Sequence, residues 1–390
     1  MKKLNLLQTW VALICCVLMS SCGRLEKGNL ACINVAQTYP EKEVALSDMA
    51  DVTYVHIASD NEEYLFRGRM VSFWKNTIMI HDTSSGSLLF FTKEGSPKSR
   101  FNRKGNGPED YIGVNQAVYD EERDEVFVAY RNVIQVYSST GDYKRKISLP
   151  PGSFVSPMVS FDDESLFLYD ASGQYSADER EESYASPFVR ISKTDGKVLD
   201  SVELPTADIV LGLHRDMNGR QMLVRGITHH LIQCAEGALL CNPETDTVFL
   251  YGKDGYLAPV MYKTPAVDAL DPMVYLNNCI DAGRYQFMEI YTIRFEEGAL
   301  PYPVTYLMRD KETSEVFRQK ITLPEYEGKN LIISPRQSGR YEEGAFFELD
   351  LLELKQAYNE GRLSGKLKEL VATLDENKDN NIFLLAKFKS

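Results

Sequence analysis

The stretch Leu88-Leu-Phe-Phe-Thr-Lys-Glu-Gly95 decides the fold, because the chain repeats its pattern four more times. In each copy an apolar, β-rich run leads into a short polar turn, and four of the five turns end in glycine. The other copies occupy residues 133–141, 188–196, 248–255 and 304–314, the last of them without the glycine. Strand-forming residues followed by such turn chemistry predict a β-hairpin at each copy.

The spacing of the copies predicts how the hairpins are arranged. The turns end at positions 95, 141, 196, 255 and 314, which are 46, 55, 59 and 59 residues apart. A period of about 45–60 residues with four strands each is typical of a propeller blade. Five hairpins and the C-terminal segment therefore predict six blades. The alternative is a series of unrelated hairpins in β-sandwich domains.

Two helices are predicted near the C-terminus. Apolar residues recur at helical spacing over 346–359 and 363–375, and Gly361 and Ser364 lie between them as stop and cap. Residues 381–389 then indicate one last strand. The helices are expected to form an excursion from the last blade, on a face or at the rim.

A propeller ring must be closed, and one terminal strand often completes a blade built from the other end of the chain. Residues 44–46 or 52–57 are the candidate partners of the last strand. The predicted fold class is thus all-β, a six-bladed β-propeller with a short C-terminal helical excursion.

The first 22 residues have the pattern of an export signal. Lys2 and Lys3 precede the mostly apolar residues 4–18, and Met19-Ser20-Ser21-Cys22 resembles a bacterial lipobox, whose cysteine is lipidated. An ordinary signal peptide and an N-terminal anchor are the alternatives. The predicted organisation is a lipoprotein signal peptide at 1–21, a tether at 22–42 and the propeller at 43–390.

Acylation of Cys22 would make a lipid membrane the first partner, because buried acyl chains form a stable anchor. No other segment approaches the roughly 18 apolar residues of a spanning helix. Residue 23 is Gly rather than Asp, which favours export to the outer membrane. We therefore predict a lipid-anchored protein of the cell envelope, with the periplasmic or outer side left open.

The charge of the chain excludes one class of partner. The formal net charge is −13, and loss of Lys2 and Lys3 with the signal leaves 41 basic against 56 acidic residues, or −15. Nucleic-acid binding depends on neutralising phosphates with Lys and Arg, so no nucleic acid is expected. A hydrophobic content of 44% argues against disorder.

Four cysteines remain for the folded body once the signal and the lipidated residue are set aside. They are Cys32, Cys234, Cys241 and Cys279. An oxidising compartment permits three pairings among them, and Cys234 and Cys241 could lie on neighbouring strands, but buried thiols are an equal alternative. None of the spacings matches a zinc site.

Residues 102–111 carry a resemblance to a known family. The run Gly105-x-Gly107-Pro108-Glu109-x-Tyr111 is similar to the Gly-x-Gly-Pro-Gly-Glu-Tyr signature of a family of bacterial six-bladed β-propeller lipoproteins, related to NHL and TolB-like propellers. Residues 45–57 and 367–385 also look like that family's entry segment and closing end. The resemblance covers about 43–390 and implies the fold and lipid anchoring more firmly than any activity.

The same motif has two physical interpretations. Its glycines permit positive φ, its proline fixes φ, and Tyr111 can bury its ring while its hydroxyl finds a partner. One interpretation is a blade-to-blade turn. The other is a ligand-facing loop in which Arg103 and Lys104 donate to an anion.

Histidines form the other candidate site. His214 and Arg215 are followed by Arg225, His229 and His230 in a strand-like stretch. Adjacent residues of a strand point to opposite faces, so His229 and His230 do not easily bind one metal together. Surface or hairpin positions are the alternative, and a metal or glycan site is possible if one of them faces the central channel with His214.

Other chemistry is sparse. No nucleophile elbow, zincin motif, phosphate loop or EF-hand occurs, and no catalytic residue, metal site or cofactor is predicted. Residues 375–381 are acidic and could hold Ca²⁺, although such a run is more often a solvated turn. Trp74, Tyr169, Tyr175 and Tyr184 could stack on a sugar, with core packing the alternative for Trp74 and Tyr169.

Two functions from different classes follow. The first is a membrane-anchored binding module for a protein or glycan ligand, without evident catalysis. The second is a lactonase-like propeller hydrolase or lyase with a metal in the axial channel, whose ligands would come from distant strands that spacing cannot reveal. Whether the chain is an enzyme stays open, with binding preferred.

Overall fold

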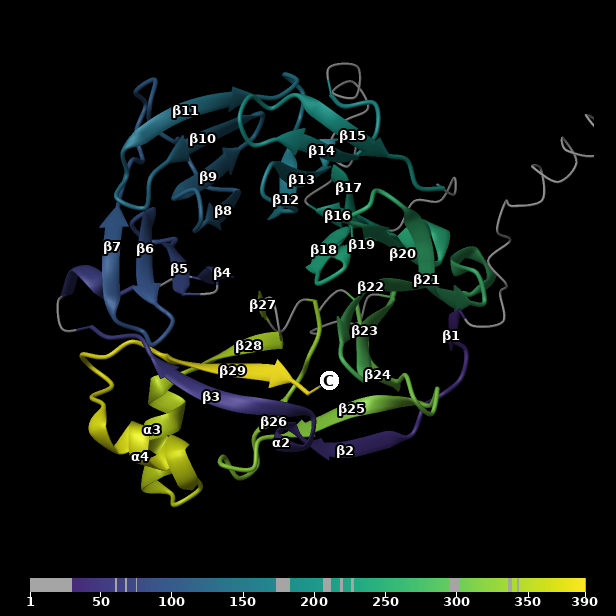
Figure 1. Ribbon diagram of the computed structural model, residues 1–390. Coiled ribbons are helices and arrows are strands. Elements are labelled where there is room, and N and C mark those ends of the chain that lie inside the picture. The colour runs from purple at the N-terminus through teal and green to yellow at the C-terminus, as the bar shows by residue number, and fades with distance from the viewer. Residues whose placement is uncertain are drawn as a thin grey trace, which may run out of the picture.

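Six sheets, each with four blade strands, surround a central axis in the computed structural model, and two of them carry additional strands (Figure 1). The structure describes residues 30–59, 62–66, 69–74, 76–172, 183–205, 212–217, 220–225, 228–294, 302–335, 339–341 and 344–389. For 69–72, 212–217, 220–225 and 339–341 only the backbone assignment is described. The predicted lipoprotein signal, Cys22 and the first part of the predicted tether lie outside these residues.

The first three blades follow one another along the chain, each from its inner strand to its outer strand. Their strands are β4 (Arg69–Phe73), β5 (Thr77–Asp82), β6 (Ser87–Thr92) and β7 (Pro97–Phe101); β8 (Gln116–Asp120), β9 (Glu125–Tyr130), β10 (Val133–Tyr137) and β11 (Tyr143–Ser148); and β12 (Val155–Ser160), β13 (Ser165–Asp170), β14 (Phe188–Ser192) and β15 (Val198–Val202). The second strands of these blades are therefore β5, β9 and β13.

Blades four to six complete the ring. Their strands are β18 (Leu231–Cys234), β19 (Gly237–Asn242), β20 (Thr247–Gly252) and β21 (Leu257–Thr264); β22 (Val274–Ala282), β23 (Tyr285–Thr292), β24 (Val304–Asp310) and β25 (Val316–Thr322); and β27 (Gly339–Tyr341), β28 (Gly344–Leu349), β29 (Ile382–Phe388) and β3 (Ala50–His56). A separate hairpin, β16 (Gly212–Met217) with β17 (Arg220–Arg225), lies between blades three and four.

The five predicted hairpins all join the third strand of a blade to its outer strand, so the predicted repeat is confirmed. The repeated glycine has a steric cause at 95, 141 and 196, because these three turns press on the outer strand of the preceding blade. Gly95 has a φ of +93°, and a Cβ there would lie 2.0 Å from the carbonyl oxygen of His56. In the fifth copy Ser314 keeps the left-handed backbone, with a φ of +60°.

Residues from the two ends of the chain close the ring. β29 pairs antiparallel with β3 over seven residues, from Ile382 opposite His56 to Phe388 opposite Ala50. This confirms 52–57 as the partner of the last strand. Of the other candidate, 44–46, the first two residues end β2 (Glu41–Ala45), which instead pairs parallel with β25 on the outside of blade five, and Leu46 begins the short helix α2 (Leu46–Met49).

The predicted tether at 22–42 is wrong for part of its length, because two of its segments are strands. β1 (Ala31–Asn34) pairs parallel with β21 on the outer edge of blade four, and β2 begins at Glu41. Ala31 and Ile33 enter the apolar cluster between blades four and five. Polar residues surround these short strands in the sequence, so their few apolar side chains did not by themselves predict strands.

The predicted helix at 346–359 also starts too early. Residues up to Leu349 form β28, and helix α3 spans Leu351–Asn359 with the Asp350 side chain accepting from the Glu353 amide. Helix α4 spans Gly365–Thr373 after Ser364, and Gly361 between the helices has a φ of +75°. The apolar residues of 346–349 satisfy both helical and strand spacing, and pairing with β29 decides for the strand.

Six apolar clusters hold the blades together, one between each pair of neighbours around the ring. Helices α3 and α4 pack into the cluster shared by blades five and six, through Leu354 and Leu367 among others. In the described part of the chain, no disulfide joins any two of Cys32, Cys234, Cys241 and Cys279. Cys234 and Cys241 do lie on neighbouring strands, but Cys234 pairs with Gly237 instead.

The antiparallel order defines two faces of the ring. The loop face carries the connection between the second and third strands of each blade, and the connection from each outer strand to the inner strand of the next blade. The turn face carries the turns between the first and second strands and between the third and fourth strands. The inner strands of blades one, three and five depart from regular register near their loop-face ends, and those of blades two and four do not. Such bulges re-aim side chains next to the axial channel.

Candidate functional site at the loop-face mouth of the channel

The centre of the candidate site is His229, which lies just before the inner strand of blade four. Its backbone is held on both sides by blade five: the His229 amide donates to Asn277 Oδ1 at 2.7 Å, and its carbonyl accepts from Asn278 Nδ2 at 2.7 Å. Both asparagines are fully buried, whereas His229 is half-buried. Two buried amides therefore fix one residue on the loop face, at the ends of the inner strands that surround the axis; we call this place the mouth.

The bulge in β22 produces this clamp. Leu276 pairs with Ile290 and Cys279 with Met288, so Asn277 and Asn278 together stand opposite the single residue Glu289. Asn277 Nδ2 donates to Glu289 Oε2 at 2.9 Å. Because the same side chain accepts from a backbone N–H, its amide orientation is fixed by its partners.

Glu289 is the buried support of the clamp. Its side chain has no exposure, and its Oε2 also accepts from the Tyr291 hydroxyl at 3.0 Å. The Tyr291 ring stacks on Tyr275 with centroids 5.1 Å apart. Buried polar groups cost free energy unless they are hydrogen-bonded, so the series from Tyr291 through Glu289 and Asn277 to His229 rigidifies the mouth.

His230 is held from the opposite side, by blade three. Its ring stacks on Tyr169 with centroids 4.0 Å apart and 9° between the planes. Tyr169 is the residue that stands opposite the bulged Ser156–Pro157 pair of β12. Blade five thus holds His229 and blade three contacts His230, and the inner strand of each of these two blades has a bulge.

The hydrogen bonds of His230 define its protonation. Nδ1 lies 2.9 Å from the Cys241 carbonyl and Nε2 lies 2.7 Å from the Thr228 hydroxyl. A carbonyl only accepts, so Nδ1 carries the proton, and a neutral Nε2 can accept from Thr228. Burial lowers the pKa of His230 from 6.5 to about 4. His230 is therefore a neutral part of the packed wall.

Only part of the predicted histidine group is brought together. His229 and His230 are neighbours at the mouth, in the segment before β18 and not on a strand as expected. His214 and Arg215 lie on β16, opposite Leu223 and Met222, and Arg225 lies at the end of β17 opposite Gly212. The side chains of these three residues lie outside the described part of the chain.

The Tyr111 motif forms a tightly bonded connection between β7 and β8 on the loop face. Tyr111 is 1% exposed, and its hydroxyl donates to the Gly86 carbonyl at 2.6 Å and accepts from the Arg103 amide at 3.2 Å. Asp110 Oδ2 accepts from the Gly107 amide at 2.9 Å, and a Cβ on Gly105 would lie 2.4 Å from that oxygen. The glycines are thus required by the close approach of Asp110.

Two side chains of blade two also bond to this connection. Tyr137 donates to the Glu109 carbonyl at 2.7 Å, and Gln135 Nε2 donates to the carbonyls of Pro108 and Asp110. These contacts describe a blade-to-blade connection. For the predicted anion donors, Arg103 lies 3.8 Å from the Glu109 carboxylate, while Lys104 is exposed and its stem lies over Gly86. A ligand for them stays a prediction.

The acidic run at 375–381 is a turn with hydrogen bonds inside it and from Asp379 and Asn380 to residues 57–66. Asp375 accepts from the Asn377 amide at 3.0 Å and pairs with Lys378, and Asp379 accepts from the Asp375 amide at 2.8 Å. Within the described ranges, no group of three or more His, Cys, Asp or Glu side chains is placed to hold a metal ion. The prediction of Ca²⁺ gains no support from these contacts.

The predicted aromatic residues divide between core and loop. Trp74 packs against the cluster between blades one and two, and Tyr169 is buried in the cluster between blades three and four. Tyr184 is half-buried beside the cluster between blades two and three, and Tyr175 lies outside the described residues. Core packing, the alternative for Trp74 and Tyr169, is therefore confirmed.

Sequence reasoning missed Asn277, Asn278 and Glu289. One signal existed, since Asn-Asn interrupts an otherwise apolar strand and two adjacent amides are costly there without partners. Their partners lie 48 residues away at His229 and 12 residues away at Glu289. The residues of such a site come from different blades, so no short spacing along the sequence reveals them.

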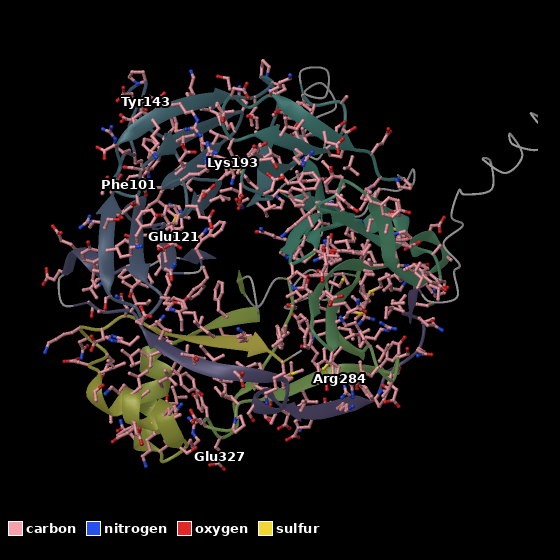
Figure 2. All side chains as sticks on the ribbon, in the orientation of Figure 1. Phe101, Glu121, Tyr143, Lys193, Arg284 and Glu327 are labelled. Carbon is pink, nitrogen blue, oxygen red and sulfur yellow. The ribbon has the colours of Figure 1, made fainter. Side chains whose placement is uncertain are left out.

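Charged side chains on the turn face form bonds both between blades and within one blade. Lys193 is 1% exposed and bonds Asp120 Oδ2 at 2.6 Å and the Asp162 carbonyl at 2.7 Å, joining blades two and three where Figure 2 labels it. Glu121 of blade two bonds Thr77 of blade one at 2.8 Å, and Arg284 pairs with Asp310 within blade five (Figure 2). These partners are mutually satisfied, which makes the turn face a structural face.

In the part of the chain that the structure describes, no helix has the length and apolar character needed to span a membrane.

Comparisons with known proteins agree with the architecture. A family model described as a six-bladed β-propeller matches residues 24–199, and the chain is itself a six-bladed β-propeller. A crystal structure of a Bacteroides fragilis protein, whose name describes it as exported, is similar over 92% of this chain and 99% of its own, with a TM-score of 0.62 at 15% identity.

Two other solved structures are less similar. A Bacteroides vulgatus protein of another uncharacterised family aligns over 87% of this chain and 97% of its own, at 12% identity and a TM-score of 0.48. A virginiamycin B lyase from Staphylococcus aureus aligns over 87% and 99%, at 10% identity and a TM-score of 0.39. No curated protein sequence matches the chain. The predicted relation to NHL and TolB-like propellers stays a prediction.

Proposed function

We propose that the protein is a membrane-anchored, extracytoplasmic binding module, and that it binds a glycan at the loop-face mouth of its channel. The observation that carries the proposal is the clamp on His229, whose backbone amide and carbonyl are both held by buried asparagines. A binding site needs groups held in place by a second layer of hydrogen bonds. Glu289 and Tyr291 supply that layer here.

The chemistry of the mouth favours a polar ligand. The half-buried residues there are Thr228, with its hydroxyl, and His229, with its imidazole, while the amides of Asn277 and Asn278 are buried and hold the His229 backbone. Sugar hydroxyls both donate and accept hydrogen bonds, which matches this mixture of groups. The name given to the similar Bacteroides fragilis protein, "putative exported protein", agrees with an extracytoplasmic location.

Substitution of His229 tests the binding site. We expect the wild-type chain to be retained on at least one member of an array of bacterial and plant polysaccharides, and His229→Ala to lose about tenfold in affinity, or about 1.4 kcal/mol. His81→Ala, which removes another half-buried histidine far from the clamp, is the matched control and should bind normally. Retention on none of the polysaccharides, or equal loss in both variants, would contradict the glycan site.

Substitution of Cys22 tests the anchor. Cys22→Ser should move the protein from the membrane fraction to the soluble fraction, because the thiol that carries the acyl chains is gone. Fractionation followed by immunoblotting measures this directly. If the variant still sediments with membranes and wild-type protein carries no acyl group, the lipobox interpretation is wrong.

The alternative of a metal-dependent hydrolase or lyase stays a prediction. No described contact favours it, and the side chains of 69–72, β27 and the β16–β17 hairpin lie outside the described part of the chain.

A further inference from the structure

The outer edges of the blades differ in how they are protected. An edge strand leaves unpaired backbone groups, and proteins protect such edges with Lys, Arg or Pro or cover them with another segment. In blades four and five the chain covers its own edges, because β1 and β2 add as fifth strands parallel to β21 and β25.

The outer strands of blades one and two are protected by their sequences. β7 reads Pro-Lys-Ser-Arg-Phe and β11 reads Tyr-Lys-Arg-Lys-Ile-Ser. β15 reads Val-Leu-Asp-Ser-Val, with neither a basic residue nor a proline. It pairs with β14 and with no other strand of the described chain.

The exposed surface of β15 is apolar. Val198 and Leu199 are each 45% exposed, and they are two of the few large apolar side chains at the surface of the described residues. The one charged residue of β15 is Asp200, and both oxygens of its carboxylate are already hydrogen-bonded. Its Oδ2 accepts from the Tyr251 hydroxyl of blade four, and its Oδ1 accepts from the Ser201 amide at 2.8 Å.

We propose that β15 is a docking edge for an extended segment of a partner protein, which adds to blade three as a fifth strand. The chain itself supplies the precedent, since β1 occupies the equivalent edge of the adjacent blade, parallel to the outer strand. Main-chain hydrogen bonds would give the affinity, and apolar side chains against Val198 and Leu199 the specificity. The partner is therefore an unpaired, apolar β-segment that runs parallel to β15.

A peptide copy of the native fifth strand is a suitable probe. Residues 30–38 of this chain include β1, the segment that already augments blade four. Hydrogen–deuterium exchange of the full chain, with and without excess peptide, reports on each edge. At about nine-tenths occupancy we expect exchange of the outward amides of 198–203 to slow about tenfold, with no change in β7 or β11.

Two variants separate docking from a change in the fold. Leu199→Lys places a charge on the edge and should abolish the protection. Leu352→Lys changes an exposed leucine of helix α3, 68% exposed, and should leave the protection unchanged. Absence of protection at β15, or equal protection at β11, would overturn the proposal. A dimer in light scattering that Leu199→Lys abolishes would assign the edge to a second copy, and would overturn it too.

Discussion

Replacing Lys193 by methionine is expected to lower the free energy of unfolding by about 3–5 kcal/mol, the cost typical of removing one partner of a buried ion pair. Lys193 Nζ is bonded to Asp120 Oδ2 and to the Asp162 carbonyl, and neither the lysine nor Asp120 is accessible to water. The variant would leave the Asp120 carboxylate buried and without its cation. Chemical denaturation of wild type and variant measures the difference.

Two companion variants show whether the loss comes from the buried charge. The double variant Lys193→Met, Asp120→Leu should recover most of the stability, because well-packed apolar residues often replace a buried pair without cost. Lys311→Met breaks the exposed pair with Asp281, with side chains 35% and 33% exposed, and should cost less than about 1 kcal/mol. Equal losses in Lys193→Met and Lys311→Met would show that the bond between blades two and three has no special role.

The second large effect is a loss of stability in acid caused by His230. Burial lowers the pKa of His230 to about 4, whereas the unfolded chain titrates near 6.5. Between these two values the unfolded state binds the proton and the folded state does not, so stability falls as the pH falls from 6.5 to 4. At 1.36 kcal/mol per pH unit, the interval corresponds to about 3 kcal/mol.

A variant isolates this contribution from that of the carboxylates. Gln at position 230 can donate to the Cys241 carbonyl and accept from Thr228, as the neutral imidazole does. We expect the unfolding free energy of His230→Gln to decline less steeply below pH 6.5, and to run parallel to wild type above it. Parallel curves from pH 7 to pH 4 would show that His230 is accessible to protons in the folded state.

The repeat was predictable from sequence because its cause is local. The turn glycines at 95, 141 and 196 recur since each turn lies against the outer strand of the preceding blade, with left-handed φ and no room for a Cβ. Ring closure was predictable to within two candidates, and pairing with β29 selects β3. Pairing also explains the error at 346–349, where β28 takes residues with helical spacing.

The candidate site was only half predictable. His229 and His230 could be singled out as adjacent polar residues, but their holders come from blades three and five. Glu289 and Tyr169 became significant only when register placed each opposite a bulge of an inner strand. Likewise β1 carries little apolar signal on its own, and the edge of blade four decides its structure.

The central claim is that a glycan binds at His229 on the loop face. Crystals grown with an oligosaccharide from the polysaccharide that the wild-type chain retains test it most directly. The account predicts ligand density at the mouth of the channel, within hydrogen-bonding distance of His229, with the bulge of Asn277 and Asn278 unchanged behind it. Density on the turn face or at the rim, with none at the mouth, would contradict it.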